Sequence, residues 1–171
     1  MTSKTNHLQP RRLLVLRHAK SSWSEPGMAD FDRPLNDRGR SSAQVMGHKL
    51  HSEKMVADVV LASTATRVRE TLDLLLPAWK WNGPVLWEKS LYLASPETLL
   101  NHLAALDNAW HTAMIVGHNP GLSELVAQLT GNSTDLPTAA LVVLANDQSD
   151  WPEALRTRLW HQQAYWKPKE A

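Results

Sequence analysis

Hydrophobic positions in this sequence follow two patterns that alternate along the chain. Short, mainly apolar runs at residues 13–16, 58–62 and 112–116 have the length of strands that are buried on both faces. Between the runs, apolar residues recur at every third or fourth position, which is typical of a helix that buries one face. This alternation predicts an α/β fold, in which helices cover both faces of a mostly parallel central sheet.

Polar caps, proline and glycine mark where the predicted helices begin and end. Asn36 and Ser95 precede two helical patterns as N-caps, and a proline at the tolerated first position follows Ser95. Ser63 is predicted to cap the helix between them, which stops near Pro77. A fourth helix is closed by Gly131. The predicted helices cover residues 36–50, 63–77, 95–103 and 122–129.

The remaining segments lack helical periodicity. Residues 85–93, 136–145 and 158–166 are predicted to be extended, and no convincing long helix separates the last two. Consecutive strands without a crossover helix pair antiparallel, so these two predict an antiparallel edge on the sheet. Residues 19–34 hold Gly27 and two prolines and are predicted to form a loop.

The length of 171 residues and the hydrophobic fraction of 43% are typical of one globular domain. We expect residues 11–171 to form this domain and residues 1–10 to be a polar lead-in. The lead-in has no apolar core of a signal peptide, and no run approaches the ~18 apolar residues of a membrane span. The sequence therefore predicts a cytoplasmic protein that does not bind membranes.

Composition narrows the chemistry. Lys and Arg total 18 against 17 for Asp and Glu, so no general basic charge indicates nucleic acid, and any anion site has to be local. The absence of cysteine excludes disulfides, zinc ribbons, iron–sulfur clusters and thiol nucleophiles. Eight histidines remain. His48 and His51 have helical spacing, but no acidic residue in the neighbouring turns completes a metal site, and we predict that they are solvated.

Two histidines occupy matching positions at the ends of predicted strands. His18 follows the run at 13–16, and His118 follows the run at 112–116. Ligands of open α/β sheets bind beyond the carboxyl ends of the strands, so both imidazoles are expected in one crevice. Arg17 adjoins the first histidine, and Arg67 lies in the first turn of a helix, where backbone amides favour an anion.

A crevice with these four side chains suits phosphoryl transfer. Guanidinium groups match phosphate oxygens bidentately and stabilise a transferring phosphoryl group. A neutral imidazole is nucleophilic near pH 7, and a second imidazole beside the bound anion can stay protonated. A single histidine at a strand end is more often structural. Two of them with two arginines favour catalysis.

The motifs that hold these residues resemble a known family. Leu-Arg-His-Ala-Lys at 16–20, the S-x-x-x-R-x-x-x-T spacing from Ser63 to Thr71, and Gly-His-Asn-Pro at 117–120 are similar to the histidine phosphatase superfamily. More narrowly, Arg-His-Ala-Lys-Ser-Ser-Trp at 17–23 and Arg-Pro-Leu-Asn at 33–36 resemble the SixA-type phosphohistidine phosphatases. The resemblance covers residues 13–166 and implies the phosphoglycerate mutase-like fold.

The resemblance also implies roles for individual residues. His18 would be the nucleophile and become a phosphohistidine intermediate. Arg17, Arg67 and His118 would bind the phosphoryl oxygens. The residues implied to contact the substrate are Arg33, Ser63 and Asn119. No metal and no cofactor is implied.

The proton donor is missing from its usual place. Many superfamily members have a carboxylate after the third strand, whereas residues 90–95 read Ser-Leu-Tyr-Leu-Ala-Ser. Glu88, Glu97, Asp30 and Asp32 are the nearest candidates, and no spacing selects one of them. A phosphohistidine substrate reduces this requirement, because a neutral imidazole leaves more readily than an alkoxide.

The chain is too short for a large cap over the crevice, and an open pocket with Trp23 at its rim suits a protein substrate. The resemblance thus implies a phosphatase that removes the phosphoryl group from a phosphohistidine of a protein. Two alternatives are a small-molecule phosphomonoesterase of the same superfamily and a non-catalytic phosphate-binding or interaction protein. The sequence makes no prediction of oligomeric state.

Overall fold

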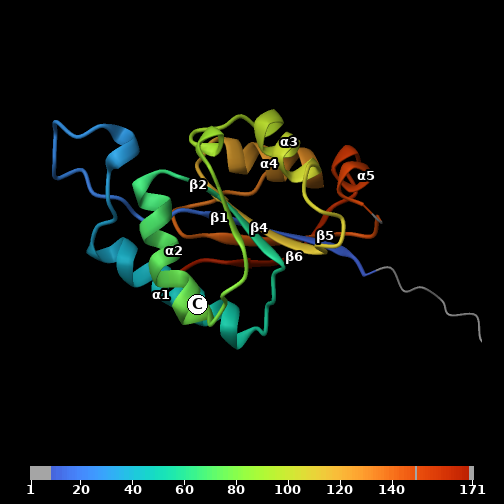
Figure 1. Cartoon of the computed structure of the whole chain (residues 1–171), viewed down its shortest axis with the longest axis horizontal. Coiled ribbons are helices and arrows are strands. Elements are labelled where there is room, and N and C mark those ends of the chain that lie inside the picture. Colours follow the sequence, from blue (N-terminus) through green and yellow to red (C-terminus); the bar gives the residue numbers. More distant parts are fainter. Residues whose placement is uncertain (1–8, 149, 170–171) are drawn as a thin grey trace, which may run out of the picture.

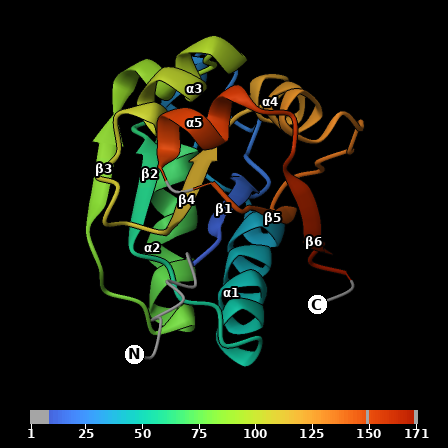
Figure 2. The same ribbon diagram turned by 90° about the vertical axis from the view of Figure 1, so that its right-hand side faces the viewer.

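A six-stranded sheet runs through the computed structural model, which describes residues 9–148 and 150–169 (Figure 1). The order across the sheet is β3-β2-β4-β1-β5-β6, as Figure 2 shows from β3 at the left to β6 at the right. The strands are Arg11–Arg17 (β1), Val59–Ser63 (β2), Val85–Glu88 (β3), Thr112–Gly117 (β4), Leu141–Asn146 (β5) and His161–Trp166 (β6). Residues 1–8 of the predicted lead-in lie outside the described part.

The pairing of the strands confirms the predicted sheet. Strands β1, β2, β3 and β4 pair in parallel, whereas β5 is antiparallel to both β1 and β6. Leu13, Leu14, Val15 and Leu16 are all completely buried, as expected for a central strand that is covered on both faces.

Helices cover both faces of the sheet, which confirms the predicted α/β class. In Figure 1, α1 and α2 lie below the sheet and α3, α4 and α5 lie above it. Each face has its own hydrophobic core, one with Leu14 and Leu16 and the other with Leu13 and Val15. The helices are Asp37–Ser52 (α1), Thr66–Trp79 (α2), Pro96–Ala104 (α3), Gly121–Thr130 (α4) and Trp151–Arg156 (α5).

Three of the predicted caps are present. The Asn36 side chain accepts a hydrogen bond from the Gly39 amide at 2.8 Å, and Ser95 accepts one from Thr98 at 3.3 Å. Gly131 ends α4 in the left-handed conformation with φ of 76°. Gly39 is also required for close packing, because a Cβ atom there would lie 2.1 Å from the carbonyl oxygen of Lys20. This contact holds the loop after β1 against α1.

The prediction for α2 was wrong at both ends. Ser63 belongs to β2, and the helix begins at Thr66 after Ala65, with no side-chain cap. The helix also continues through Pro77 to Trp79. The last turn persists because the Trp79 ring is buried and its Nε1 donates to the Met55 carbonyl at 2.8 Å.

Three extended segments are shorter than predicted. Strand β3 ends at Glu88 and is followed by a 3-10 turn, η2 (Lys89–Leu91), while β5 and β6 begin at Leu141 and His161. A short helix, α5, lies between β5 and β6. Asp150 caps it by accepting from the Glu153 amide at 2.8 Å, and Trp151 is completely buried. Burial of one tryptophan stabilises a helix that periodicity over six residues could not reveal.

Candidate active site

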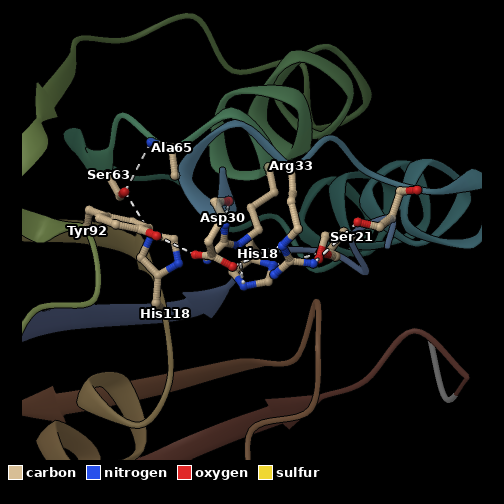
Figure 3. A network of polar contacts seen from close by, with 11 residues as sticks. His18, Ser21, Asp30, Arg33, Ser63, Ala65, Tyr92 and His118 are labelled. Carbon is tan, nitrogen blue, oxygen red and sulfur yellow. Dashed lines mark hydrogen bonds and ion pairs between the residues drawn. The ribbon is translucent and has the colours of Figure 1, made fainter. Parts of the chain in front are cut away.

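The carboxyl ends of β1 and β4 place the two predicted histidines side by side. Arg17 pairs with Gly117 in the sheet, and the next residue along each chain segment is a histidine. The ring centroids of His18 and His118 are 5.3 Å apart, and both side chains are buried (Figure 3). Equal strand register therefore brings together two imidazoles that are 100 residues apart.

Hydrogen bonds define which nitrogen of His18 is reactive. Nδ1 lies 2.7 Å from the Ala19 carbonyl oxygen and donates to it, so Nε2 carries the free lone pair of the neutral ring. Burial is the largest cause that lowers the pKa of His18 to about 4. The guanidiniums of Arg67, Arg17 and Arg33 act in the same direction, and the Ala19 bond opposes them. His18 is therefore neutral at pH 7 and suited to nucleophilic attack.

One turn of α2 explains the R-x-x-x-T part of the motif, from Arg67 to Thr71. Arg67 in the first turn donates from Nε to Nε2 of His18 at 3.3 Å. One turn later, the Thr71 hydroxyl donates to the Arg67 carbonyl at 2.6 Å and accepts from the Ala19 amide at 3.0 Å. The arginine and the backbone that follows the nucleophile are thereby fixed to the same helix.

A carboxylate from the first loop links the arginines. Asp30 begins the 3-10 turn η1 (Asp30–Asp32) and accepts from Arg33 Nε at 2.9 Å and from Arg67 Nη2 at 3.1 Å. Its carbonyl accepts from Arg67 Nη1 at 2.7 Å, and the Tyr92 hydroxyl also donates to the carboxylate. The Tyr92 bond and both arginines hold the pKa of Asp30 at about 2 against the effect of burial. Asp30 is therefore ionised.

From the sequence, Asp30 was only one of four candidate proton donors, and Tyr92 was assigned no role. The spacing of three residues between Asp30 and Arg33 could have indicated their ion pair, which forms within one turn. No local signal indicates Tyr92, which follows η2 in the segment where a carboxylate was expected. Its ring packs edge-on against His118 at 5.2 Å and against Phe31 at 4.9 Å.

The sequence predicts that the second imidazole can stay protonated beside a bound anion; among the side chains of the protein itself, His118 is neutral. Burial is the largest cause that lowers the pKa of His118, and together with His18 and Arg67 it brings the pKa to about 3. Its Nε2 bonds to the Ser63 hydroxyl at 2.8 Å, and Nδ1 is buried without a partner among the described residues. Both imidazoles are thus neutral with these neighbours, because burial and adjacent positive charge act in the same direction.

Of the other predicted site residues, Arg33 and Arg17 line the site, whereas Ser63 lies behind His118. Arg33 is buried with Nη1 on the Ser21 hydroxyl at 2.6 Å. Arg17 donates to the Leu136 carbonyl at 3.0 Å, and burial lowers its pKa. Ser63 is completely buried behind His118, where it orients that ring and does not face the cavity, contrary to the expected substrate contact.

Asn119 lines the site, but both ends of its amide are engaged within the fold. Nδ2 donates to the Leu136 carbonyl at 3.0 Å, and Oδ1 accepts from the Ser123 amide at 3.1 Å and from its hydroxyl at 2.9 Å. These hydrogen bonds stabilise the turn before α4, so the Asn119 side chain has a structural role.

All of the predicted site residues except Ser63 line one cavity of about 520 Å³, which we call the His18 cavity. Trp23 stands at its rim with its side chain 75% exposed, and the Arg33 guanidinium lies 3.5 Å from the centre of the indole ring. The charged or ionisable residues of the lining are Arg17, His18, Lys20, Asp30, Arg33, Arg67 and His118. Such a lining can hold an oxyanion against a neutral imidazole.

The part of the chain that the structure describes contains neither a metal-binding cluster nor a helix that could span a membrane. No group of three or more His, Asp or Glu residues within residues 9–148 and 150–169 could hold a metal ion. His48 and His51 are both exposed on α1. None of the helices described there is long and apolar enough to cross a bilayer.

Comparisons with known proteins identify the family. The model of the histidine phosphatase superfamily (branch 1) matches residues 13–91. The crystal structure of a protein assigned as the phosphohistidine phosphatase SixA of Agrobacterium tumefaciens is 30% identical, with a TM-score of 0.79 over 94% of this chain and 99% of that one. The chain belongs to the histidine phosphatase superfamily. Its motifs and its phosphoglycerate mutase-like fold are those that the sequence resemblance predicted.

Other relatives of this histidine phosphatase family member extend the likeness. An uncharacterized protein of Mycobacterium leprae is 34% identical over 142 residues, which are 75% of this chain and 86% of the relative. The fold is shared with the protein histidine phosphatase SixA in complex with tungstate, at a TM-score of 0.79 and 20% identity over 92% of this chain and 97% of that one.

Proposed function

We propose that this protein is a phosphatase that hydrolyses phosphohistidine on a protein through a covalent phosphohistidine at Nε2 of His18. The observation that carries the proposal is the neutral His18, whose unprotonated Nε2 accepts from Arg67 inside a cavity lined by guanidinium groups. Superfamily membership supports phosphoryl transfer in general, and the SixA structures with the same fold support phosphohistidine as the substrate.

In the first step, the lone pair of His18 Nε2 attacks phosphorus and the P–N bond of the substrate breaks. The phosphoryl oxygens lie between the guanidiniums of Arg17, Arg33 and Arg67, which stabilise charge in the transition state. A phosphoryl dianion beside His118 raises the pKa of that imidazole, so that its buried Nδ1 can donate to an oxygen.

The state of Asp30 favours a phosphoramidate over an ester substrate. With a pKa near 2, this carboxylate is ionised at neutral pH and has no proton to give to a leaving group. An alkoxide needs such a proton, whereas a substrate imidazole leaves neutral when its other nitrogen carries a proton from solvent. The lack of a proton on Asp30 therefore supports phosphohistidine over a small phosphate ester.

In the second step, the phosphoryl dianion on His18 raises the pKa of Asp30 from its value of about 2, which makes the carboxylate a stronger base. Arg67 Nε lies 3.3 Å from Nε2 of the unphosphorylated His18, and Nη2 of the same guanidinium holds the Asp30 carboxylate, so the carboxylate is fixed close to the nitrogen that carries the phosphoryl group. Water attacks phosphorus and gives its proton to Asp30, the P–Nε2 bond breaks, and inorganic phosphate leaves. His18 recovers its lone pair.

We further propose that the protein acts in the cytoplasm on a phosphohistidine signalling protein. The exposed Trp23 at the rim and the open cavity support a macromolecular substrate, because a phosphohistidine on a protein surface must enter the cavity together with the surrounding chain.

The test compares kcat/KM on a phosphohistidine peptide with kcat/KM on sugar phosphates and a phosphoserine peptide. We expect the first to be at least about 100-fold higher, because the site lacks the acid that contributes about that factor to ester cleavage. His18→Ala should abolish turnover and acid-labile labelling by substrate phosphate, while His48→Ala on the exposed face of α1 should change neither. Equal rates on a sugar phosphate would refute the substrate class, and turnover by His18→Ala would refute the mechanism.

A further inference from the structure

A second cavity, of about 460 Å³, adjoins the His18 cavity. Its walls come from the loop after β1, the first half of α1 and the segment that follows β6. Lys20, Pro137 and Thr138 line both cavities, so the two form one continuous depression. A polypeptide whose phosphohistidine enters the His18 cavity can therefore extend directly into the second cavity.

Positive charge is concentrated in this second cavity, which we call the basic groove. Four cationic side chains line it, namely Lys20, Arg38, Lys167 and Lys169. No carboxylate occurs among the described residues of its lining. Asp37, the acidic neighbour of Arg38 on α1, forms an ion pair with Arg40. The concentration of cations is a local feature, because the whole chain carries a net charge of only +1.

We propose that the basic groove binds an acidic segment of the phosphoprotein substrate, next to its phosphohistidine. The proposal rests on the proposed function of the His18 cavity. Aspartate and glutamate side chains of that segment match Lys20, Lys169 and Arg38. Val45 and Pro168 offer apolar contacts to the aliphatic parts of these acidic side chains. Charge complementarity of this kind gives specificity and faster association rather than chemistry.

The lining favours a polypeptide over a nucleic acid. Single-stranded nucleic acids combine backbone contacts with stacking of bases on aromatic rings. The described residues that line the basic groove include serine, threonine, proline and valine beside the cations, and no aromatic ring. A groove with short polar and aliphatic walls accommodates carboxylate side chains better than bases.

The experiment uses two phosphohistidine peptides that differ only next to the phosphohistidine, with Asp and Glu in one and Asn and Gln in the other. Wild type should hydrolyse the acidic peptide with a kcat/KM about tenfold higher, and this preference should shrink as salt shortens the range of the charges. The double variant Arg38→Glu/Lys169→Glu should lose the preference and keep its rate on the neutral peptide.

The matched control is Arg12→Glu, an exposed charge reversal at the opposite end of β1, which should keep the preference. Misfolding of the double variant is not expected, because both side chains are exposed and a glutamate in the first turn of α1 suits the helix dipole. The unchanged rate on the neutral peptide reports directly that the fold is intact.

Equal rates of wild type on both peptides would overturn the groove proposal and leave the proposed function standing, as would a preference that persists in the double variant. Hydrolysis of neither peptide would overturn the proposed function and this inference with it. A single-stranded oligonucleotide that inhibits wild type where the unphosphorylated acidic peptide does not would assign the groove to nucleic acid instead.

Discussion

Replacement of Arg67 by lysine keeps the positive charge of the site but removes the guanidinium geometry. The native side chain is 3% exposed and makes three hydrogen bonds, to His18 Nε2 at 3.3 Å, to the Asp30 carbonyl at 2.7 Å and to the Asp30 carboxylate at 3.1 Å. An ammonium group on a flexible stem cannot reach these three acceptors in the same directions. Arg67→Lys therefore tests whether positive charge alone supports catalysis or whether the geometry of the guanidinium is also needed.

The magnitude follows from the bonds that are lost. If the ammonium replaces one of the three contacts, two remain unmade, each involving a charged group worth about 1.5–3 kcal/mol. The longest bond, to His18, is the weakest of the three, so we take about 3–4 kcal/mol for the pair in the transition state. This corresponds to a fall in kcat/KM of about 100- to 1000-fold.

The assay is steady-state hydrolysis of a phosphohistidine peptide, with thermal unfolding of the same preparations as a check on the fold. Arg69→Lys is a matched control, because Arg69 is on the same helix but donates to the Thr64 carbonyl and stacks on Trp87 outside the His18 cavity. A folded Arg67→Lys variant within threefold of wild type would refute the reasoning, because charge alone would then suffice.

Three further predictions concern pH, the base and packing. His18 has a folded pKa of about 4, below the unfolded value of about 6.5, so the unfolded state binds more protons between these values and stability falls as pH decreases. From pH 7 to pH 5, this histidine alone should lower the free energy of unfolding by about 2 kcal/mol, measured by urea denaturation. No change in that free energy would contradict the buried neutral imidazole. Asp30→Asn should slow hydrolysis of the phosphoenzyme about 100-fold, so that acid-labile phosphate accumulates on the enzyme in rapid-quench experiments. An amount of labelled enzyme no higher than in wild type would argue against the role of Asp30 as base. Gly39→Ala should lower stability by more than about 2 kcal/mol in thermal unfolding because its Cβ meets the Lys20 carbonyl at 2.1 Å, whereas Gly27→Ala, with nothing within 4 Å, should leave it unchanged, and equal melting points would disprove the close packing.

The histidine pair could be predicted because it depends on local patterns. Apolar runs indicate strands, a parallel sheet aligns their carboxyl ends, and His18 and His118 each follow such a run directly. Arg67 was placed correctly in the first turn of α2 for the same reason, although the helix begins three residues later than predicted. One turn of error at a helix end does not move a side chain to another face of the fold.

Asp30 and Tyr92 could not be connected from the sequence. They are 62 residues apart, and their contact depends on how the loop after β1 folds over η2, for which no periodicity exists. The structural roles of Ser63 and Asn119 also depend on partners that are distant in sequence. Ser63 hydrogen bonds to His118, and Asn119 hydrogen bonds to the carbonyl of residue 136.

The alternation of strands and helices, the two strand-end histidines and the superfamily motifs were determined by the sequence alone, because hydrophobic period and residue spacing act over a few residues. Only the tertiary structure decided the protonation state of the site. Burial beside Arg17 and Arg67 keeps His18 and His118 neutral, and contacts with Tyr92, Arg33 and Arg67 keep Asp30 ionised. A pKa depends on the charges and solvent around a group in three dimensions, and that environment comes from parts of the chain that no local pattern relates.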